Sequence, residues 1–376
     1  MSERKLHSER IERVVVRGAN WVGDAVMTIP ALRALRRVLP GAHVTLATRA
    51  WAEGIFTDVD FIDDVMRVDG DERHGLLRAR VAEIRALREA RFDLAVIFPN
   101  AFAPALVAAV ARVPMRIGYA TGGRRHLLTH PLAPPEWRHQ RHEVFYYLNI
   151  IAELERAVTE TDGETRRTVD ISAPPPPLGL TIASVRQDGA REVLRRHGAR
   201  LDRPLVALCP GSTNSRAKRW PSERFAALAD QLIDAAGAEV VLIGAREELD
   251  VTRQVVRGMN RRAVMLTGET SLAETVAVLS VCDLLITNDT GPAHIAAAIS
   301  LPTLVIFGPT DPTTTRPFSD LAEVVREPPE CAPCMLRDCP IDHRCMTAIT
   351  PQDVFARADR VLLRRGVTVA TAGTAR

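Results

Sequence analysis

Short runs of β-branched and aliphatic residues alternate with longer amphipathic stretches along most of the chain. This alternation is typical of βαβ units, whose strands pair in parallel sheets that helices cover. We expect strands at 14–17, 44–47, 94–98, 116–118, 205–208, 240–243, 264–266, 284–287 and 303–307. We expect helices at 26–38, 76–89, 143–154, 184–197 and 223–236, with a last one near 351–365. The pattern therefore predicts an α/β fold.

A chain of 376 residues is longer than one hydrophobic core usually serves, so two domains are expected. The run APPPPLGL at 173–180 is the expected linker, because four prolines fix φ and remove backbone donors. Each half opens with an apolar strand, a glycine-bearing turn and a helix. We expect Rossmann-like domains over 1–177 and 178–376 that face each other across a cleft, with ligands beyond the carboxyl ends of the strands.

Composition and apolar patterning exclude several classes of protein. The net charge of +3 comes from 49 basic and 46 acidic residues spread along the chain, which argues against a dedicated nucleic-acid-binding protein. The N-terminal segment is polar and charged, unlike a secretory leader. The longest apolar stretches fall short of the roughly 20 residues that span a bilayer. We expect a cytoplasmic protein without a transmembrane segment, a location that leaves peripheral membrane binding open.

The segment NDTGPAH at 288–294 follows a predicted strand and opens a helix. Thr290 is placed to cap that helix, and Gly291 lets backbone approach a ligand closely. A helix N-terminus with free N–H groups binds phosphate. The alternative is that Asp289 and Thr290 only cap the helix, and this segment alone does not separate the two interpretations.

A second glycine-bearing turn, PGSTNSRAKRWP, follows the strand at 205–208. Gly211, Ser212 and Thr213 supply amides and hydroxyls, and Lys218 follows within reach. An ammonium, hydroxyls and a helix N-terminus together suit a diphosphate without any metal. A lysine is more often simply solvated, but Lys218 stands directly before a tryptophan and a proline, which a solvated charge run does not need.

Two further corners carry carboxylates. In LIGAREELD, Glu247 or Glu248 is placed to bind a ribose diol, as acidic residues after Rossmann strands do. Favourable charge at a helix N-terminus explains these residues equally well. In the first half, Asp24 is the only carboxylate in the turn NWVGDAVMTIP. It suits a general base that accepts a proton from a substrate hydroxyl, and it suits a helix cap as well.

Together these segments resemble the ADP-heptose:lipopolysaccharide heptosyltransferases, which are family-9 glycosyltransferases of the GT-B fold. Five blocks in the family's order carry the resemblance: WVGDAVMTIPALRAL, FPNAFAPALVAAVARVPMRIGYATGGRRHLLT, LCPGSTNSRAKRWPSERFAALADQLI, VVLIGAREELD and LLITNDTGPAHIAAAISLPTLVIFGPT. The resemblance implies inverting transfer of heptose from ADP-L-glycero-D-manno-heptose to a heptosylated Kdo-lipid A, presented at the cytoplasmic membrane. It implies no catalytic metal.

The resemblance also implies roles for individual residues. Asp24 matches the catalytic base, and Lys218 matches the lysine that holds the donor diphosphate. The donor-binding set comprises Gly211, Ser212, Thr213, Lys218, Glu248, Asp289, Thr290, Gly291 and His294. Arg116, Arg124 and Arg125 belong to a basic run that suits the anionic acceptor and equally suits a solvated face.

The segment CAPCMLRDCPIDHRC places Cys331, Cys334, Cys339 and Cys345 at ligand-like spacing. In a reducing cytosol these four thiols fit a structural zinc site. Free thiols or an oxidation-sensitive disulfide pair together are the favoured alternative. The heptosyltransferase motifs do not require this cluster. We therefore place it outside the chemistry.

Three other functions remain open at this point. A sister glycosyltransferase that acts at another core position is the nearest, because loops whose shape the sequence does not reveal form the acceptor pocket. A nucleotide-sugar epimerase of GT-B type would turn over the donor alone. A nucleotide-binding module regulated by metal would bind the donor and leave it intact.

Overall fold

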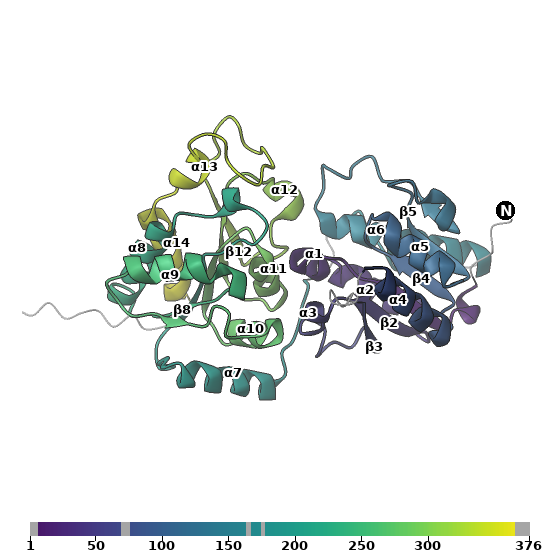
Figure 1. Cartoon of the computed structure of the whole chain (residues 1–376), viewed down its shortest axis with the longest axis horizontal. Helices are drawn as coiled ribbons and strands as arrows, with labels where there is room; N and C mark the ends of the chain where they lie inside the picture. Colours follow the sequence, from purple (N-terminus) through teal and green to yellow (C-terminus); the bar gives the residue numbers. More distant parts are fainter. Residues whose placement is uncertain (1–6, 69–75, 163–166, 174–176, 365–376) are drawn as a thin grey trace, which may run out of the picture. The chain divides into compact units, whose positions relative to one another are not determined.

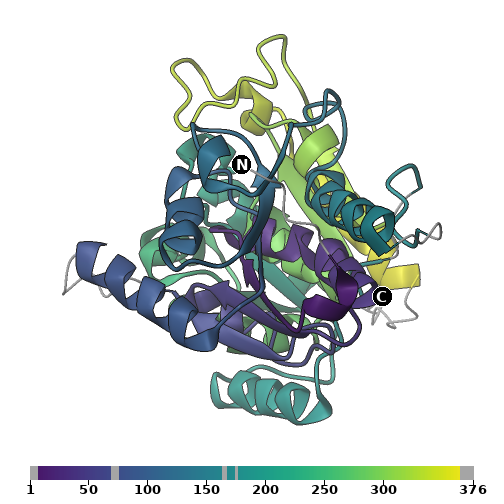
Figure 2. The same cartoon turned by 90° about the vertical axis from the view of Figure 1, so that its right-hand side faces the viewer.

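A computed structural model describes residues 7–68, 76–162, 167–173 and 177–364. The chain divides into two compact units, residues 1–176 and 177–376 (Figures 1 and 2). The boundary falls in the proline run, of which 174–176 lie outside the described residues.

The described part of the first unit forms a six-stranded parallel sheet in the order β3-β2-β1-β4-β5-β6. Its strands are β1 Arg13–Arg17, β2 His43–Thr48, β3 Asp64–Arg67, β4 Leu94–Ile97, β5 Met115–Tyr119 and β6 His130–Leu132. Its helices are η1 Ser8–Arg10, α1 Val22–Met27, α2 Ile29–Val38, α3 Ala50–Glu53, α4 Leu76–Ala90, α5 Phe102–Val110, η3 Arg125–Leu127 and α6 Glu143–Asp162. This strand order is that of a dinucleotide-binding Rossmann domain.

The described part of the second unit repeats the plan, with the order β12-β11-β10-β7-β8-β9 and every pairing parallel. Its strands are β7 Leu205–Cys209, β8 Glu239–Leu242, β9 Val264–Met265, β10 Leu284–Asn288, β11 Thr303–Phe307 and β12 Ala322–Arg326. Its longer helices are α7 Ser184–Arg196, α8 Ser222–Asp234, α9 Leu249–Gly258, α10 Leu272–Leu279, α11 Gly291–Ala298 and α14 Pro351–Arg364. Short helices are η4 Arg216–Lys218, η5 Arg246–Glu248, α12 Pro312–Thr315 and α13 Arg344–Thr347.

Central strands are buried along their length because helices cover both faces of each sheet. Residues of β7 and β10 are all buried, as a near-continuous apolar run in a parallel sheet requires. In the first unit, α4 and α5 pack on the sheet face that carries Val15, Ala95 and Ile97. In Figure 2, α4 is the long indigo helix at the left. The expected pair of Rossmann-like domains is confirmed.

The sequence pattern missed three strands, β3, β6 and β12, all at the edges of their sheets. An edge strand is half-exposed and carries a weak apolar pattern, and β6 contains Pro131, which an edge tolerates. The predicted helix at 26–38 was wrong in extent, because the structure breaks it at Thr28 into α1 and α2. Pro30 removes one amide donor there. No helix among the described residues is long and apolar enough to cross a membrane.

Candidate functional site

Lys218 and Asp289 come from loops that follow the neighbouring strands β7 and β10. Parallel strands end at the same edge of a sheet, so the two loops meet there. The Lys218 ammonium lies 2.6 Å from Oδ2 of Asp289 and 3.4 Å from the Asp289 carbonyl oxygen. The same carboxylate oxygen accepts a 2.7 Å hydrogen bond from the hydroxyl of Thr310, in the loop after β11. Three adjacent strand ends thus contribute to one polar cluster.

Asn288, at the end of β10, fixes the two loops relative to each other. Its side-chain nitrogen donates to the carbonyl oxygens of Pro210 at 2.8 Å and Gly211 at 3.2 Å, and its side-chain oxygen accepts from the backbone nitrogen of Trp220 at 3.0 Å. The asparagine is fully buried. Every polar atom of a buried amide needs a partner, so this geometry holds both ends of the Lys218 loop.

The predicted helix start is present, but its side chains do not cap it. α11 begins at Gly291 with Thr290 at the N-cap position, and no side-chain cap bond forms there. The Thr290 hydroxyl lies 3.2 Å from the Thr287 hydroxyl, and the Asp289 carboxylate is bonded to Lys218 and Thr310 instead. The interpretation of Asp289 and Thr290 as simple caps is therefore wrong. His294 is buried one turn into the helix.

Glu248 is also buried at this edge, after β8. Its carboxylate accepts hydrogen bonds from the Thr213 hydroxyl at 3.2 Å and from the Ala245 amide at 2.9 Å. A Cβ atom at position 211 would lie 2.2 Å from the Glu248 carboxyl carbon. An alanine at this position would therefore have to displace the buried Glu248 carboxylate. The neighbouring Ser212 is buried, and its carbonyl oxygen accepts from the Arg219 guanidinium.

The cysteine-rich loop at 327–343 packs directly on the Lys218 loop. The Ala217 amide donates to the Arg337 carbonyl at 2.9 Å, His343 Nε2 lies 2.6 Å from the Ala217 carbonyl oxygen, and Arg216 pairs with Asp338 at 2.6 Å. The loop thus fixes the residue directly before Lys218. Nothing in the sequence pattern signalled this contact.

Of the four clustered cysteines, Cys331 is exposed, Cys334 and Cys339 are half-buried, and Cys345 is buried. Burial raises the pKa of the Cys345 thiol, and the electrostatic influence of the other three cysteines raises it further. Among the residues that the structure describes, no three His, Cys, Asp or Glu side chains are grouped as a metal site. The cluster therefore stays a sequence prediction.

In the first unit, Asp24 lies on α1 after β1, at the carboxyl edge of that sheet. The Tyr147 hydroxyl donates to its Oδ1 at 3.1 Å. Burial raises the pKa of the nearby Glu143 to about 6, while Arg138 lowers it and the negative charge of Asp24 raises it. Burial together with Asp24 also holds the pKa of Tyr147 well above its usual value. Sequence reasoning missed both α6 residues, because no local motif marks them.

The three predicted acceptor arginines have different environments. Arg124 is fully buried, and its guanidinium donates to the carbonyl oxygens of Tyr119 at 2.7 Å and Ala101 at 3.1 Å, and also to that of Pro99. Burial lowers its pKa to about 10. The prediction that Arg124 binds the acceptor directly is therefore wrong. Its guanidinium is buried and already donates its hydrogen bonds to backbone carbonyl oxygens. Arg116 is half-buried and donates to Leu127 at 2.6 Å, whereas Arg125 is exposed.

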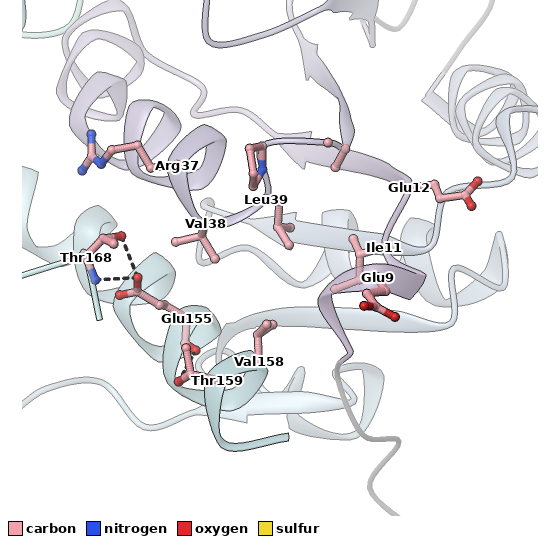
Figure 3. Close-up of a pocket in the computed structure, with 13 residues that line it drawn as sticks. Glu9, Ile11, Glu12, Arg37, Val38, Leu39, Glu155, Val158, Thr159 and Thr168 are labelled. Atoms are coloured by element: carbon pink, nitrogen blue, oxygen red, sulfur yellow. Dashed lines mark hydrogen bonds between the residues drawn. The ribbon is translucent and has the colours of Figure 1, made fainter. Parts of the chain in front are cut away.

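A cavity of about 580 Å³ lies elsewhere in the first unit. It is lined by residues such as Ile11, Glu12 and Ala42, which precede β1 and β2, so it opens at the amino ends of the strands. Figure 3 shows the carboxylate of Glu155 beside it, hydrogen-bonded to the amide and hydroxyl of Thr168 at 2.7 and 2.6 Å. The cavity contains none of the predicted site residues, and its buried carboxylate has a structural partner.

Comparison with known proteins gives consistent results. Residues 80–344 match the family model of glycosyltransferase family 9 (heptosyltransferase). The chain is 29% identical to lipopolysaccharide heptosyltransferase 2 of Escherichia coli K12, over 94% of this chain and 99% of that protein. A structure of E. coli ADP-heptose lps heptosyltransferase II superposes with a TM-score of 0.77 at 26% identity, over 95% of this chain and 100% of that one.

A family-9 glycosyltransferase structure from Veillonella parvula superposes with a TM-score of 0.81 at 24% identity, over 96% of this chain and 100% of that one, and supports the fold. The family model spans the second unit's polar cluster, and Asp24 lies before the residues that it matches. The chain belongs to glycosyltransferase family 9, the heptosyltransferases, and is a glycosyltransferase of the GT-B fold.

Proposed function

We propose that this glycosyltransferase moves heptose from ADP-L-glycero-D-manno-heptose to the heptosylated Kdo-lipid A inner core of lipopolysaccharide. The observation that carries the proposal is the Lys218–Asp289–Thr310 cluster beside the start of α11, in a chain similar over nearly its whole length to lipopolysaccharide heptosyltransferase 2. A lysine held by a buried carboxylate at a helix N-terminus suits the binding of a diphosphate.

The donor is proposed to bind in the second unit. Lys218 pairs with the diphosphate, and the amides at Thr290 and Gly291 face the same charge. Gly211, Ser212 and Thr213 border the diphosphate through backbone and hydroxyl groups. Glu248 accepts a hydrogen bond from the ribose, and His294 lines the donor side of α11. Charge that develops on the departing phosphate is then stabilised more strongly than charge in the ground state.

In the proposed reaction Asp24 accepts the proton of the acceptor hydroxyl as that oxygen attacks the anomeric carbon. The bond between the anomeric carbon and the phosphate oxygen breaks from the opposite face, and ADP departs with the bonding electrons. One displacement inverts the anomeric configuration and needs one base. The hydrogen bond from Tyr147 holds the Asp24 carboxylate in place.

The proposal needs no metal ion for chemistry, because Lys218 and the helix amides supply the positive charge. The four cysteines are kept as a candidate structural zinc site outside the reaction. Enzyme dialysed against a chelator should therefore retain its turnover, and elemental analysis of the purified protein decides the zinc content. The acceptor is proposed to be used at the inner face of the cytoplasmic membrane, with Arg125 as the exposed arginine that meets its phosphates or carboxylates.

The decisive experiment is transfer from ADP-heptose to purified Kdo-lipid A acceptors that carry zero, one or two heptoses, read by mass spectrometry. A gain of one heptose on the mono-heptosylated acceptor alone is expected. Transfer to a different member of the panel would keep the glycosyltransferase and move it to another core position. Isomerisation of the donor without transfer would instead identify an epimerase.

A further inference from the structure

Helix α5 exposes a row of large apolar side chains. Phe102, Leu106 and Val110 are 47, 39 and 42% exposed and lie four residues apart, so they share one face of the helix. The opposite face is buried against the sheet through residues such as Ala105 and Ala108. We call the three exposed side chains the α5 stripe. Single exposed apolar residues are ordinary, whereas these three form one apolar row on a nine-residue helix.

The surroundings of the α5 stripe are strongly basic. Residues 78–128 contain nine arginines and only three carboxylates. Glu83 is paired with Arg80, and Asp93 accepts the backbone amides of Glu12 and Arg13. The third carboxylate, Glu89, is exposed on α4 and offsets part of the positive charge. The exposed arginines are Arg78, Arg85, Arg88, Arg91, Arg112 and Arg125.

Helix α4 brings part of this charge to the α5 stripe. Arg78, Arg85 and Arg88 fall on one helical face, and α4 packs beside α5 (Figure 1). The Arg88 guanidinium donates to the Val110 carbonyl oxygen at 2.7 Å, which places a positive charge at the end of the α5 stripe. Arg112 follows the same helix end and is exposed. An apolar row bordered by arginines results.

This combination fits a lipid surface better than a second copy of the chain. A two-fold dimer through this face would oppose two sets of arginines, and like charges repel. The α5 stripe consists of three side chains along about 12 Å of helix. Its area is too small for a stable protein interface, which buries about 800 Å² per partner. Interfacial helices use just such an apolar face with basic neighbours.

We propose that the α5 stripe and its bordering arginines dock the first unit on an anionic phospholipid bilayer. The inference rests on the proposed function, in which the acceptor is a membrane lipid, and it goes further by assigning the docking surface. The apolar side chains enter the headgroup boundary, while the guanidinium groups pair with lipid phosphates. Each arginine near an anionic surface contributes about fivefold to binding, an effect that salt screens.

The test is co-sedimentation of the full chain with phosphatidylcholine vesicles that contain or lack phosphatidylglycerol, at low and high salt. Wild-type protein should bind only the anionic vesicles and should dissociate at high salt. Leu106→Gln with Val110→Gln should lower binding at least tenfold. Arg85→Gln with Arg112→Gln, made separately, should lower it about 25-fold. The matched controls are Val185→Gln with Val256→Gln on α7 and α9, and Arg253→Gln with Arg257→Gln on α9, which should bind like the wild type.

Transfer to a deacylated, water-soluble acceptor separates this inference from the proposed function. The α5 and arginine variants should keep wild-type rates with that acceptor and wild-type melting temperatures. Wild-type protein that transfers heptose but ignores anionic vesicles would overturn the docking surface alone. Equal losses in the control variants would also overturn it, as would a change from dimer to monomer in the α5 variant with unchanged vesicle binding. Vesicle binding without transfer to any acceptor would instead overturn the proposed function.

Discussion

Replacing Lys218 by alanine tests the centre of the proposed donor site. The substitution removes the ammonium that lies 2.6 Å from Asp289, whose side chain is only 5% exposed. A charge-assisted hydrogen bond contributes about 1.5–3 kcal/mol, so ADP affinity should fall roughly 10- to 150-fold. Because charge on the phosphate grows during departure, kcat/KM should fall further, by about a thousandfold.

The same substitution leaves Asp289 buried beside the Thr310 hydroxyl without its cation. A buried carboxylate that loses its partner destabilises the fold, and partial exposure of the lysine reduces the cost here to about 1–3 kcal/mol. Asp289→Asn in the Lys218→Ala background should restore most of that stability without restoring ADP affinity. Chemical denaturation and ADP calorimetry measure the two effects separately.

Arg216→Ala is the matched control, because it removes an exposed cation from the same loop. Its surface ion pair with Asp338 is of the kind that contributes little. We therefore expect wild-type ADP affinity in this variant. If Lys218→Ala bound ADP as tightly as Arg216→Ala does, the diphosphate role of Lys218 would be refuted.

Asp24→Asn should lower kcat by several powers of ten with donor affinity retained, and unchanged turnover would reject this base. Wild-type kcat/KM should rise through pH about 6 as Glu143 loses its proton beside Asp24, because the new negative charge favours proton uptake by the base. Glu143→Gln should remove that inflection from the pH–rate profile. Gly211→Ala should displace the Glu248 carboxylate and lower the free energy of unfolding by about 1–3 kcal/mol, measured by thermal denaturation. Gly189→Ala lies inside α7 with open space around it, so it should raise the free energy of unfolding slightly.

Sequence pattern was sufficient for the central strands and insufficient for the edges. β7, β10 and β11 are buried on both faces and read as continuous apolar runs, which periodicity detects. β3 and β12 face solvent in part, so their residues satisfy no strict pattern. Their positions at the sheet edges can be inferred only after the order of the other strands in the sheet is known.

Motif reasoning selected the Lys218 and Asp289 loops but not the residues that hold them together. Thr310 follows β11, next to β10 in the sheet, so the strand order alone would have placed its turn at the same edge. Asn288 is part of the motif NDTGPAH, but the motif does not predict its role. Its three hydrogen bonds go to backbone atoms that are distant in the sequence. His343 reaches Ala217 across 126 positions of sequence, and no local signal encodes such a contact.

Arg124 and Arg125 show why adjacent identical residues cannot be assigned from sequence. The turns after β4 and β5 leave carbonyl oxygens of Pro99, Ala101 and Tyr119 converging on one point, and a buried carbonyl needs a donor. Arg124 satisfies them with its planar guanidinium, which presents several donors at once. Arg125, one residue on, points to solvent. Replacing Arg124 should therefore lower the free energy of unfolding, whereas replacing Arg125 should lower the affinity for the acceptor. The charge pattern of the sequence does not distinguish these two roles.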